Sequence, residues 1–260
     1  MKNNILCFIK KLCICLADLV LPRRCIVCDE KLELDEEYLC THCCSDMPLT
    51  RFWQLKHNRM ADKFNETIQK QLEKRWEMGG MTSGVHERYA YAAALFFFND
   101  DADYKKIPYR IKYVGDIAAG KHFGWRLGLE LAAAEWFRDV DTIIPVPLHR
   151  IRQWNRGYNQ AEVIASGIST ALDRPVRTDI LKRHKYTRTQ IRLNITEKAD
   201  NVAGSFSVKP GSYDGIRHIL LIDDVFTTGN TLGACFQALR DIFPSSVRIS
   251  IATLGFVGRC

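Results

Sequence analysis

Two adjacent carboxylates near the C-terminus are the side chains best placed to do chemistry. Asp223 and Asp224 directly follow the apolar run 219–222, which predicts a short buried parallel strand. Residues 227–231 are small and rich in hydroxyl groups, and 232–239 carries apolar residues at helical spacing. Open α/β sheets bind ligands at the carboxyl ends of their strands, where loop N–H groups and a helix N-terminus attract phosphate. Because carboxylates accept hydrogen bonds from a vicinal diol, the pattern predicts a ligand with a ribose and a terminal phosphate.

The alternative is a plain strand–turn–helix connection with Asp and Thr as caps, but two consecutive carboxylates would then repel without any gain. The order of residue types, four apolar residues and then Asp-Asp-x-x-Thr-Thr-Gly-x-Thr, resembles the phosphoribosyl-pyrophosphate (PRPP) loop of type I phosphoribosyltransferases. The resemblance implies that Asp223 and Asp224 are catalytic and bind the ribose 2′ and 3′ hydroxyls. It implies that the 5′-phosphate is bound by Thr227, Thr228, Gly229, Asn230 and Thr231. Phe226 is bulkier than the aliphatic residue usual at that position.

The ten cysteines are concentrated at the N-terminus, with eight of them in the first 44 residues. Two matched pairs stand out, Cys25-x2-Cys28 and Cys40-x2-Cys43. Paired C-x2-C turns supply the four thiolates of a closed tetrahedral zinc site, which we expect to serve folding or docking rather than catalysis. His42 and Cys44 lie nearby as spare ligands. Cysteines used for metal rather than for disulfides favour a cytoplasmic location.

A second group of residues follows another predicted strand, 142–147. Arg150, Arg152 and Arg156 lie beyond its carboxyl end, where arginines can clamp phosphate oxygens, although Arg150 and Arg152 are also compatible with a solvated surface. The pieces Pro145-Val-Pro147 and Arg156-Gly-Tyr-Asn-Gln160 resemble ComF-type (GntX-like) proteins, a bacterial family linked to competence and DNA uptake.

Other parts of the chain also fit the ComF resemblance. They are the four-cysteine module, the segment Lys112-Tyr-x-Gly115 and the stretch Thr189-Gln190-x-x-Leu193. The resemblance implies that Lys112 and Arg156 hold pyrophosphate. Two features depart from the family pattern: Lys198 replaces an arginine, and residues 51–86 are longer and more polar. The segment 115–122 is a near-miss for a P-loop, but it lacks the Ser or Thr needed for magnesium and lies in a predicted helix.

The elements expected around these motifs alternate between strands and helices. Strands are expected at 88–98, 142–147, 202–208, 219–222 and 247–254, and helices at 1–22, 61–77, 116–137, 161–172 and 232–239. The polar turn 99–103 predicts a hairpin after the first strand. The pattern predicts an α/β fold, a type I phosphoribosyltransferase-like parallel sheet flanked by helices. The predicted domains are 1–50 (helix and zinc module), 51–87 (helical connector) and 88–260 (phosphoribosyltransferase-like domain).

Two functions remain open from the sequence. The first is a transferase that binds PRPP with Mg²⁺, with an unknown acceptor and with residues 182–198 as a basic lid. The second is a non-catalytic PRPP-sensing or single-stranded-DNA-binding protein of the DNA uptake machinery, using the basic stretch 182–188. A net charge of +7 suits either anionic partner, and proteins of the competence machinery are further expected partners. No segment has the length of apolar sequence that a membrane span needs.

Overall fold

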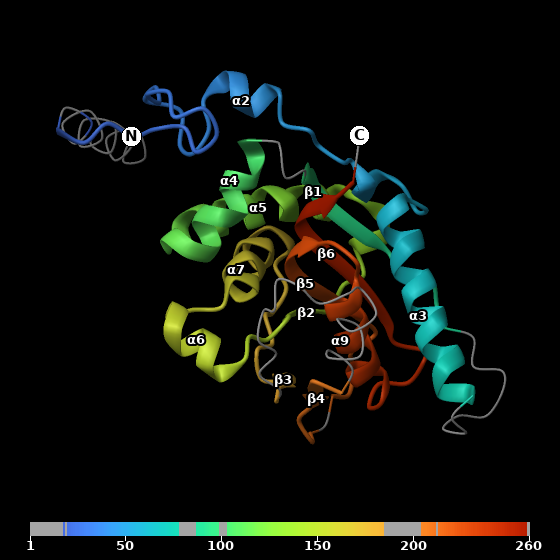
Figure 1. The fold of residues 1–260 in the computed structure, drawn as a ribbon. Helices are drawn as coiled ribbons and strands as arrows, with labels where there is room; N and C mark the ends of the chain where they lie inside the picture. Colours follow the sequence, from blue (N-terminus) through green and yellow to red (C-terminus); the bar gives the residue numbers. More distant parts are fainter. Residues whose placement is uncertain are drawn as a thin grey trace, which may run out of the picture.

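The central element is a four-stranded parallel sheet with the strand order β1-β6-β5-β2 (Figure 1). The computed structural model describes residues 18, 20–77, 87–98, 103–184, 204–211 and 213–258. The strands are β1 (Ala92–Phe98), β2 (Thr142–Pro145), β5 (His218–Phe226) and β6 (Arg248–Val257). The predicted α/β fold with a parallel sheet is confirmed. Most of the predicted helix 1–22 and of the predicted lid 182–198 lies outside the described residues.

Helices cover both faces of this sheet, which explains why its strands are almost continuously apolar. The helices are α3 (Arg59–Glu77), α5 (Ile117–Ala133), α7 (Gln160–Leu172) and α9 (Asn230–Arg240). In β5, Leu220 and Ile222 pack in the cluster that contains α5 and α7. Ile219 and Leu221 pack in the cluster that contains α3 and α9. Side chains of a strand alternate between its faces, so α5 and α7 lie on one side of the sheet and α3 and α9 on the other (Figure 1).

The layer of α5 and α7 is unusually close-packed because glycines face the opposite helix. A Cβ atom added at Gly124 would lie 2.3 Å from the carbonyl oxygen of Ile164, and one at Gly167 would lie 2.2 Å from that of Lys121. The absence of a side chain at these two positions therefore lets the two backbones touch.

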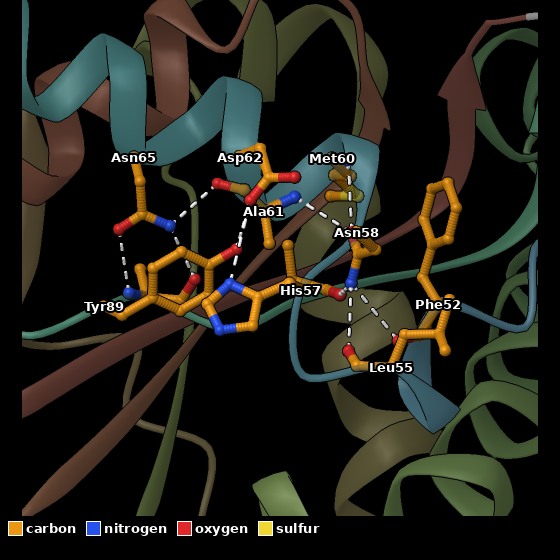
Figure 2. Close-up of polar contacts among 11 residues, drawn as sticks. Phe52, Leu55, His57, Asn58, Met60, Ala61, Asp62, Asn65 and Tyr89 are labelled. Atoms are coloured by element: carbon orange, nitrogen blue, oxygen red, sulfur yellow. Dashed lines mark hydrogen bonds and ion pairs between the residues drawn. The ribbon is translucent and has the colours of Figure 1, made fainter.

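Two amide side chains, the buried Asn58 and the partly buried Asn65, attach α3 to the beginning of β1 (Figure 2). Asn58 donates to the carbonyl oxygens of Phe52 (3.2 Å), Leu55 (3.3 Å) and Ala92 (3.0 Å). Its side-chain oxygen caps the helix by accepting from the backbone N–H groups of Met60 and Ala61. Asn65 makes a reciprocal pair with the backbone of Ala90.

The three-domain division stays a prediction, but α3 belongs to a layer of the sheet rather than to a free linker. It contributes Met60, Phe64 and Ile68 to the cluster on the face that it shares with α9.

Two expectations about local structure were wrong or incomplete. The hairpin predicted after β1 is wrong: β1 pairs in parallel with β6, and the described chain resumes at Asp103 in helical turns. These turns are η2 (Asp103–Lys105), α4 (Lys106–Tyr109) and the π-helical η3 (Arg110–Val114). A separate antiparallel pair, β3 (Leu181–Arg183) with β4 (Phe206–Val208), was anticipated only as the strand 202–208, whose residues 202 and 203 lie outside the described ones.

The remaining elements are short. They are α2 (Thr41–Ser45), η1 (Phe52–Gln54), η4 (Glu135–Phe137) and α6 (Arg150–Arg156). Within the described part of the chain, none of the helices combines the length and the apolar character needed to cross a bilayer.

Candidate functional site

The two carboxylates lie inside the end of β5 rather than in the loop after it. β5 continues to Phe226, whereas its neighbour β2 ends at Pro145, opposite Ile222. Asp223 and Asp224 therefore lie beyond the end of β2, at the carboxyl edge of the sheet where the sequence placed a ligand. Each carboxylate accepts a hydrogen bond from the backbone N–H of the next residue, Asp224 at 2.9 Å and Val225 at 2.8 Å.

The electrostatics of this pair favour a partner that compensates negative charge. Burial, followed by the adjacent charge of Asp224, raises the pKa of Asp223 to about 8. The Nζ atom of Lys112 is 3.9 Å from an Oδ atom of Asp224 and reduces this repulsion. Two carboxylates with one nearby cation can accept hydrogen bonds from a diol or share a divalent cation with a phosphorylated ligand.

The loop after β5 is shaped by Gly229 and Phe226. Gly229 has a φ of +80°, and a Cβ atom there would lie 2.9 Å from the ring of Phe226. Phe226 is buried and packs edge-on against Phe64 of α3 and stacked on Phe256 of β6. Phe226, the residue that is larger than usual at this position, thus supports the loop through its packed ring. The loop and the start of α9 enclose a small hollow of about 30 Å³, lined by Asp223 and residues 225–232.

The motif Arg156–Gln160 joins three elements around the site. Asn159 is buried, donates to the carbonyl oxygen of Val146 (3.0 Å) and caps α7 at the N–H of Ala161 (3.1 Å). Tyr158 donates to the carbonyl oxygen of Ile111 in η3. The end of β2, the start of α7 and η3 are therefore held in one arrangement by this short segment.

The same arrangement brings the two predicted pyrophosphate ligands together. The guanidinium of Arg156 and the Nζ atom of Lys112 lie 5.8 Å and 5.7 Å from the ring centroid of Tyr113. Arg156 also donates to Gln160 at 2.5 Å. Lys112 thus lies next to the acidic pair, and the ring of Tyr113 contacts both Lys112 and Arg156. Arg156 is the last residue of α6, the short helix that follows β2.

Two further basic residues lie near the site: Arg183, which belongs to the predicted basic lid 182–198, and Lys63, which the sequence did not assign to the site. Arg183 on β3 has its pKa lowered, first by burial and then by the neighbouring charge of Arg152, while Asp223 acts in the opposite direction. Lys63 on α3 donates to the carbonyl oxygen of Thr227 at 2.7 Å. Lys63 is distant from β5 in sequence, so no local pattern could have identified it.

The four predicted metal ligands form one cluster. The Sγ atoms of Cys25, Cys28, Cys40 and Cys43 all lie within 4.8 Å of one another. The Sγ atoms of Cys28 and Cys40 are 3.6 Å apart, close to the spacing of about 3.8 Å that tetrahedral Zn–S bonds of 2.3 Å require. His42 does not join the cluster and instead pairs with Asp46 at 3.3 Å.

Backbone N–H groups lower the pKa of one thiol in this cluster, which favours its thiolate form. Burial would raise the pKa of Cys25, but the N–H groups of Cys28, Cys40 and Val27 outweigh it and lower the pKa to about 7. Cys43 receives no such help, and burial with its thiol neighbours raises its pKa. Four thiols in this arrangement fit a metal ion that favours thiolate, and the closed geometry leaves no open position for a substrate.

The cysteine module contacts the segment that carries Lys112. Tyr104 donates to the carbonyl oxygen of Cys43 at 2.7 Å, and Lys106 donates to that of Val27 at 2.6 Å. Both carbonyl groups belong to the C-x2-C turns. Residues 103–114 therefore bridge the cysteine cluster and the acidic pair.

Comparison with known proteins places similar sequences among competence proteins. The chain is 38% identical over 110 residues to competence protein F of Haemophilus influenzae, a match covering 42% of this chain and 48% of the relative. It is 31% identical over 99 residues to DNA utilization protein YhgH of Escherichia coli, covering 38% and 43%. It is 32% identical over 99 residues to competence protein ComFC of Bacillus subtilis, covering 38% of each.

The matched part of the chain spans less than half the length of these curated relatives. No family model matches the chain. The matches confirm the resemblance to ComF-type competence proteins that the motifs indicated.

Proposed function

Because the chain is ComF-like in sequence, we propose that it serves competence and DNA uptake by binding PRPP with Mg²⁺ at the end of β5. Three features that meet at one edge of the sheet support this proposal. They are the acidic pair Asp223 and Asp224, the hollow formed by 225–232, and Lys112. The acidic pair lies between the hollow and Lys112, which suits PRPP because its ribose hydroxyls lie between its 5′-phosphate and its pyrophosphate.

Each group has one role in this proposal. The carboxylates of Asp223 and Asp224 accept hydrogen bonds from the ribose 2′ and 3′ hydroxyls. The N–H and hydroxyl groups of 227–231 bind the 5′-phosphate, while Lys112 and Arg156 face the pyrophosphate. Bound Mg²⁺ would neutralise charge on the pyrophosphate, since it prefers a few carboxylates together with phosphate oxygens.

The corresponding reaction is a displacement at C1 of the ribose. A nucleophile forms a bond to C1 while the bond from C1 to the pyrophosphate oxygen breaks, and positive charge develops on the sugar ring. The nearby carboxylates stabilise that charge, and the cations stabilise the departing pyrophosphate. The acceptor remains open between a base, an amine and a nucleic acid group.

Calorimetric titration with PRPP and Mg²⁺ tests the site. We expect wild-type protein to bind, and the double variant Asp223→Asn/Asp224→Asn to lose at least tenfold in affinity, because charge-assisted hydrogen bonds contribute about 1.5 to 3 kcal/mol each. Asp173→Asn, an exposed acid at the end of α7, is the matched control. Equal binding by wild type and the double variant rules out this site.

A second candidate is a binding protein without turnover, because the relatives are named for competence and DNA utilization rather than for a transferase activity. In that case PRPP is a regulatory ligand, and the protein contacts single-stranded DNA through basic residues that include Lys182 and Arg183. Pyrophosphate release measured with a panel of bases, amines and oligonucleotides separates the two candidates. Release with any acceptor supports the transferase, whereas PRPP binding with no release across the panel supports the second candidate.

The four thiols contribute to either function as a structural zinc site. Zinc fits because all four donors are soft and closely spaced, and because the predicted cytoplasmic environment keeps thiols reduced.

A further inference from the structure

One face of α3 lies against the hollow after β5. Lys63, Thr67 and Gln71 follow one another at intervals of four residues and so share one face of the helix. Lys63 bonds to Thr227, and its Nζ atom lies 5.7 Å from the ring centroid of Phe226. A Cβ atom at Gly233 would lie 2.8 Å from Nε2 of Gln71 and 3.1 Å from Cγ2 of Thr67. The helix face formed by Lys63, Thr67 and Gln71 therefore contacts both the loop and the first turn of α9.

The position of Lys63 is fixed by the packing of its helix. Phe64, the next residue, is fully buried and packs edge-on against two other rings. Its ring centroid lies 6.4 Å from that of Phe226 and 5.9 Å from that of Phe236. Thr67 donates to the carbonyl oxygen of Lys63 at 2.9 Å, one turn along the helix. The Lys63 backbone is thus fixed beside the loop, and its exposed side chain reaches the loop by the hydrogen bond to Thr227.

The hollow itself has no positive side chain. Its lining, Asp223 and residues 225–232, contains one acid and no Lys, Arg or His. A phosphate dianion placed there would meet N–H and hydroxyl groups but also the negative charge of the acidic pair. A cation directly behind the loop offsets that repulsion.

Lys63 also sets the direction of one peptide group. Its ammonium holds the carbonyl oxygen of Thr227 toward α3. The described chain has no cis peptide, so the N–H of Thr228 points the opposite way, away from α3. No residue of α3 lines the hollow, so Lys63 acts from behind the loop wall.

We infer that Lys63 is a positioning residue for a 5′-phosphate: it orients the Thr227–Thr228 peptide and adds the positive charge that makes the hollow selective for phosphorylated sugars. The inference rests on the proposed PRPP site and assigns that site a residue from a different part of the chain. Ligands that carry a sugar 5-phosphate depend on Lys63, whereas ligands that offer only pyrophosphate do not.

The test is calorimetry with three ligands, PRPP with Mg²⁺, ribose 5-phosphate, and pyrophosphate with Mg²⁺. For Lys63→Met we expect about a tenfold rise in Kd for PRPP and for ribose 5-phosphate, with pyrophosphate unchanged. Lys63→Arg should recover part of the loss. Lys112→Met should show the reverse pattern, weakening pyrophosphate and PRPP but not ribose 5-phosphate.

The matched control is Lys70→Met, an exposed lysine of the same helix that pairs with Glu66 at 2.6 Å, and it should bind all ligands normally. Ribose 5-phosphate binding by Lys63→Met equal to that of wild type overturns the inference and leaves the PRPP site intact. Equal weakening of all three ligands overturns it as well, because that result indicates general loosening of the site. A wild type that binds neither PRPP nor ribose 5-phosphate contradicts the proposed function itself, and the role of Lys63 falls with it.

Discussion

At the scale of single residues, the site depends on a few positions that have one acceptable chemistry. Gly229 is such a position, because it combines a φ of +80° with a close approach to Phe226. The sequence around β5 was sufficient to predict a strand that carries the acidic pair, followed by a glycine-containing loop and a helix, because these residues are neighbours in the chain. Lys63 was not predictable from that pattern, because it reaches Thr227 only through the packing of α3 on the sheet.

We expect Gly229→Ala to abolish or strongly weaken PRPP binding and to cost about 1 to 3 kcal/mol of stability through left-handed strain and the ring clash. Gly215→Ala is the matched control, because Gly215 has a φ of +83° with nothing within 4 Å of an added Cβ atom. Urea denaturation and calorimetry on both variants check this. Both should lose stability, and a loss of PRPP binding in the Gly215 variant of the same size would contradict the assignment.

Protonation of His218 should make the stability of the protein depend on pH. This side chain is buried, its Nδ1 atom lies 2.6 Å from Asp139 and its Nε2 atom 2.8 Å from Ser250. Burial and the charge of Arg248 lower its pKa, while Asp139 and Asp141 oppose this without reversing it. The unfolded chain therefore takes up the proton first, near its ordinary pKa of about 6.5, so stability is retained above that pH and falls as pH drops below it.

Denaturant unfolding at pH 7.5, 6.5 and 5.5 measures this effect. We expect the free energy of unfolding to fall more steeply with acidification in wild type than in His218→Asn. His122, whose pKa burial also lowers, contributes the same to both proteins and leaves a residual slope. Identical slopes would show that His218 does not titrate differently in the folded state.

At the scale of elements, the structure separates what local sequence determines from what packing determines. β5, α5, α7 and α9 were predictable because each carries its own apolar pattern, and α5 and α7 also begin at a capping Asp116 and Asn159. The hairpin after β1 was a wrong prediction, because the turn-like composition of 99–103 leads into helical turns and β6 supplies the partner strand. The place of α3 on the sheet depends on contacts of Asn58 and Asn65 with residues more than 20 positions away.

The contacts of Asn58 therefore test how α3 is attached to the sheet (Figure 2). Asn58→Ala removes a helix cap and leaves the buried carbonyl oxygen of Ala92 without its donor, so we expect a loss of about 2 to 4 kcal/mol. Asn58→Ser keeps a capping oxygen but not the amide donors and should lie between the alanine variant and wild type. Chemical denaturation ranks the three proteins, and an alanine variant as stable as wild type would contradict the anchoring role.

At the scale of the whole molecule, the four-cysteine cluster and the proposed ligand site are connected through residues 103–114. Tyr104 and Lys106 bond to carbonyl oxygens of the two cysteine turns, and Lys112 lies beside Asp224 at the other end of the segment. Metal binding orders such turns because folding and coordination are coupled. We therefore expect zinc to influence the ligand site without touching the ligand.

Metal analysis should find about one zinc per chain, and Cys25→Ser/Cys40→Ser should lose it. After chelation and removal of the chelator, PRPP affinity measured with added Mg²⁺ should fall several-fold, and restored zinc should recover it. Tyr104→Phe should keep its zinc and lose part of the affinity. Full affinity in the zinc-free protein would show that the module and the ligand site are independent.

A crystal structure of the complex with PRPP and Mg²⁺ would show whether PRPP occupies the end of β5. We predict the ribose 2′ and 3′ oxygens within hydrogen-bond distance of Asp223 and Asp224, and the 5′-phosphate in the hollow formed by 225–232. The pyrophosphate should face Lys112 and Arg156. A ligand bound elsewhere on the molecule, or a ribose that does not contact the two carboxylates, would rule out the proposed PRPP site.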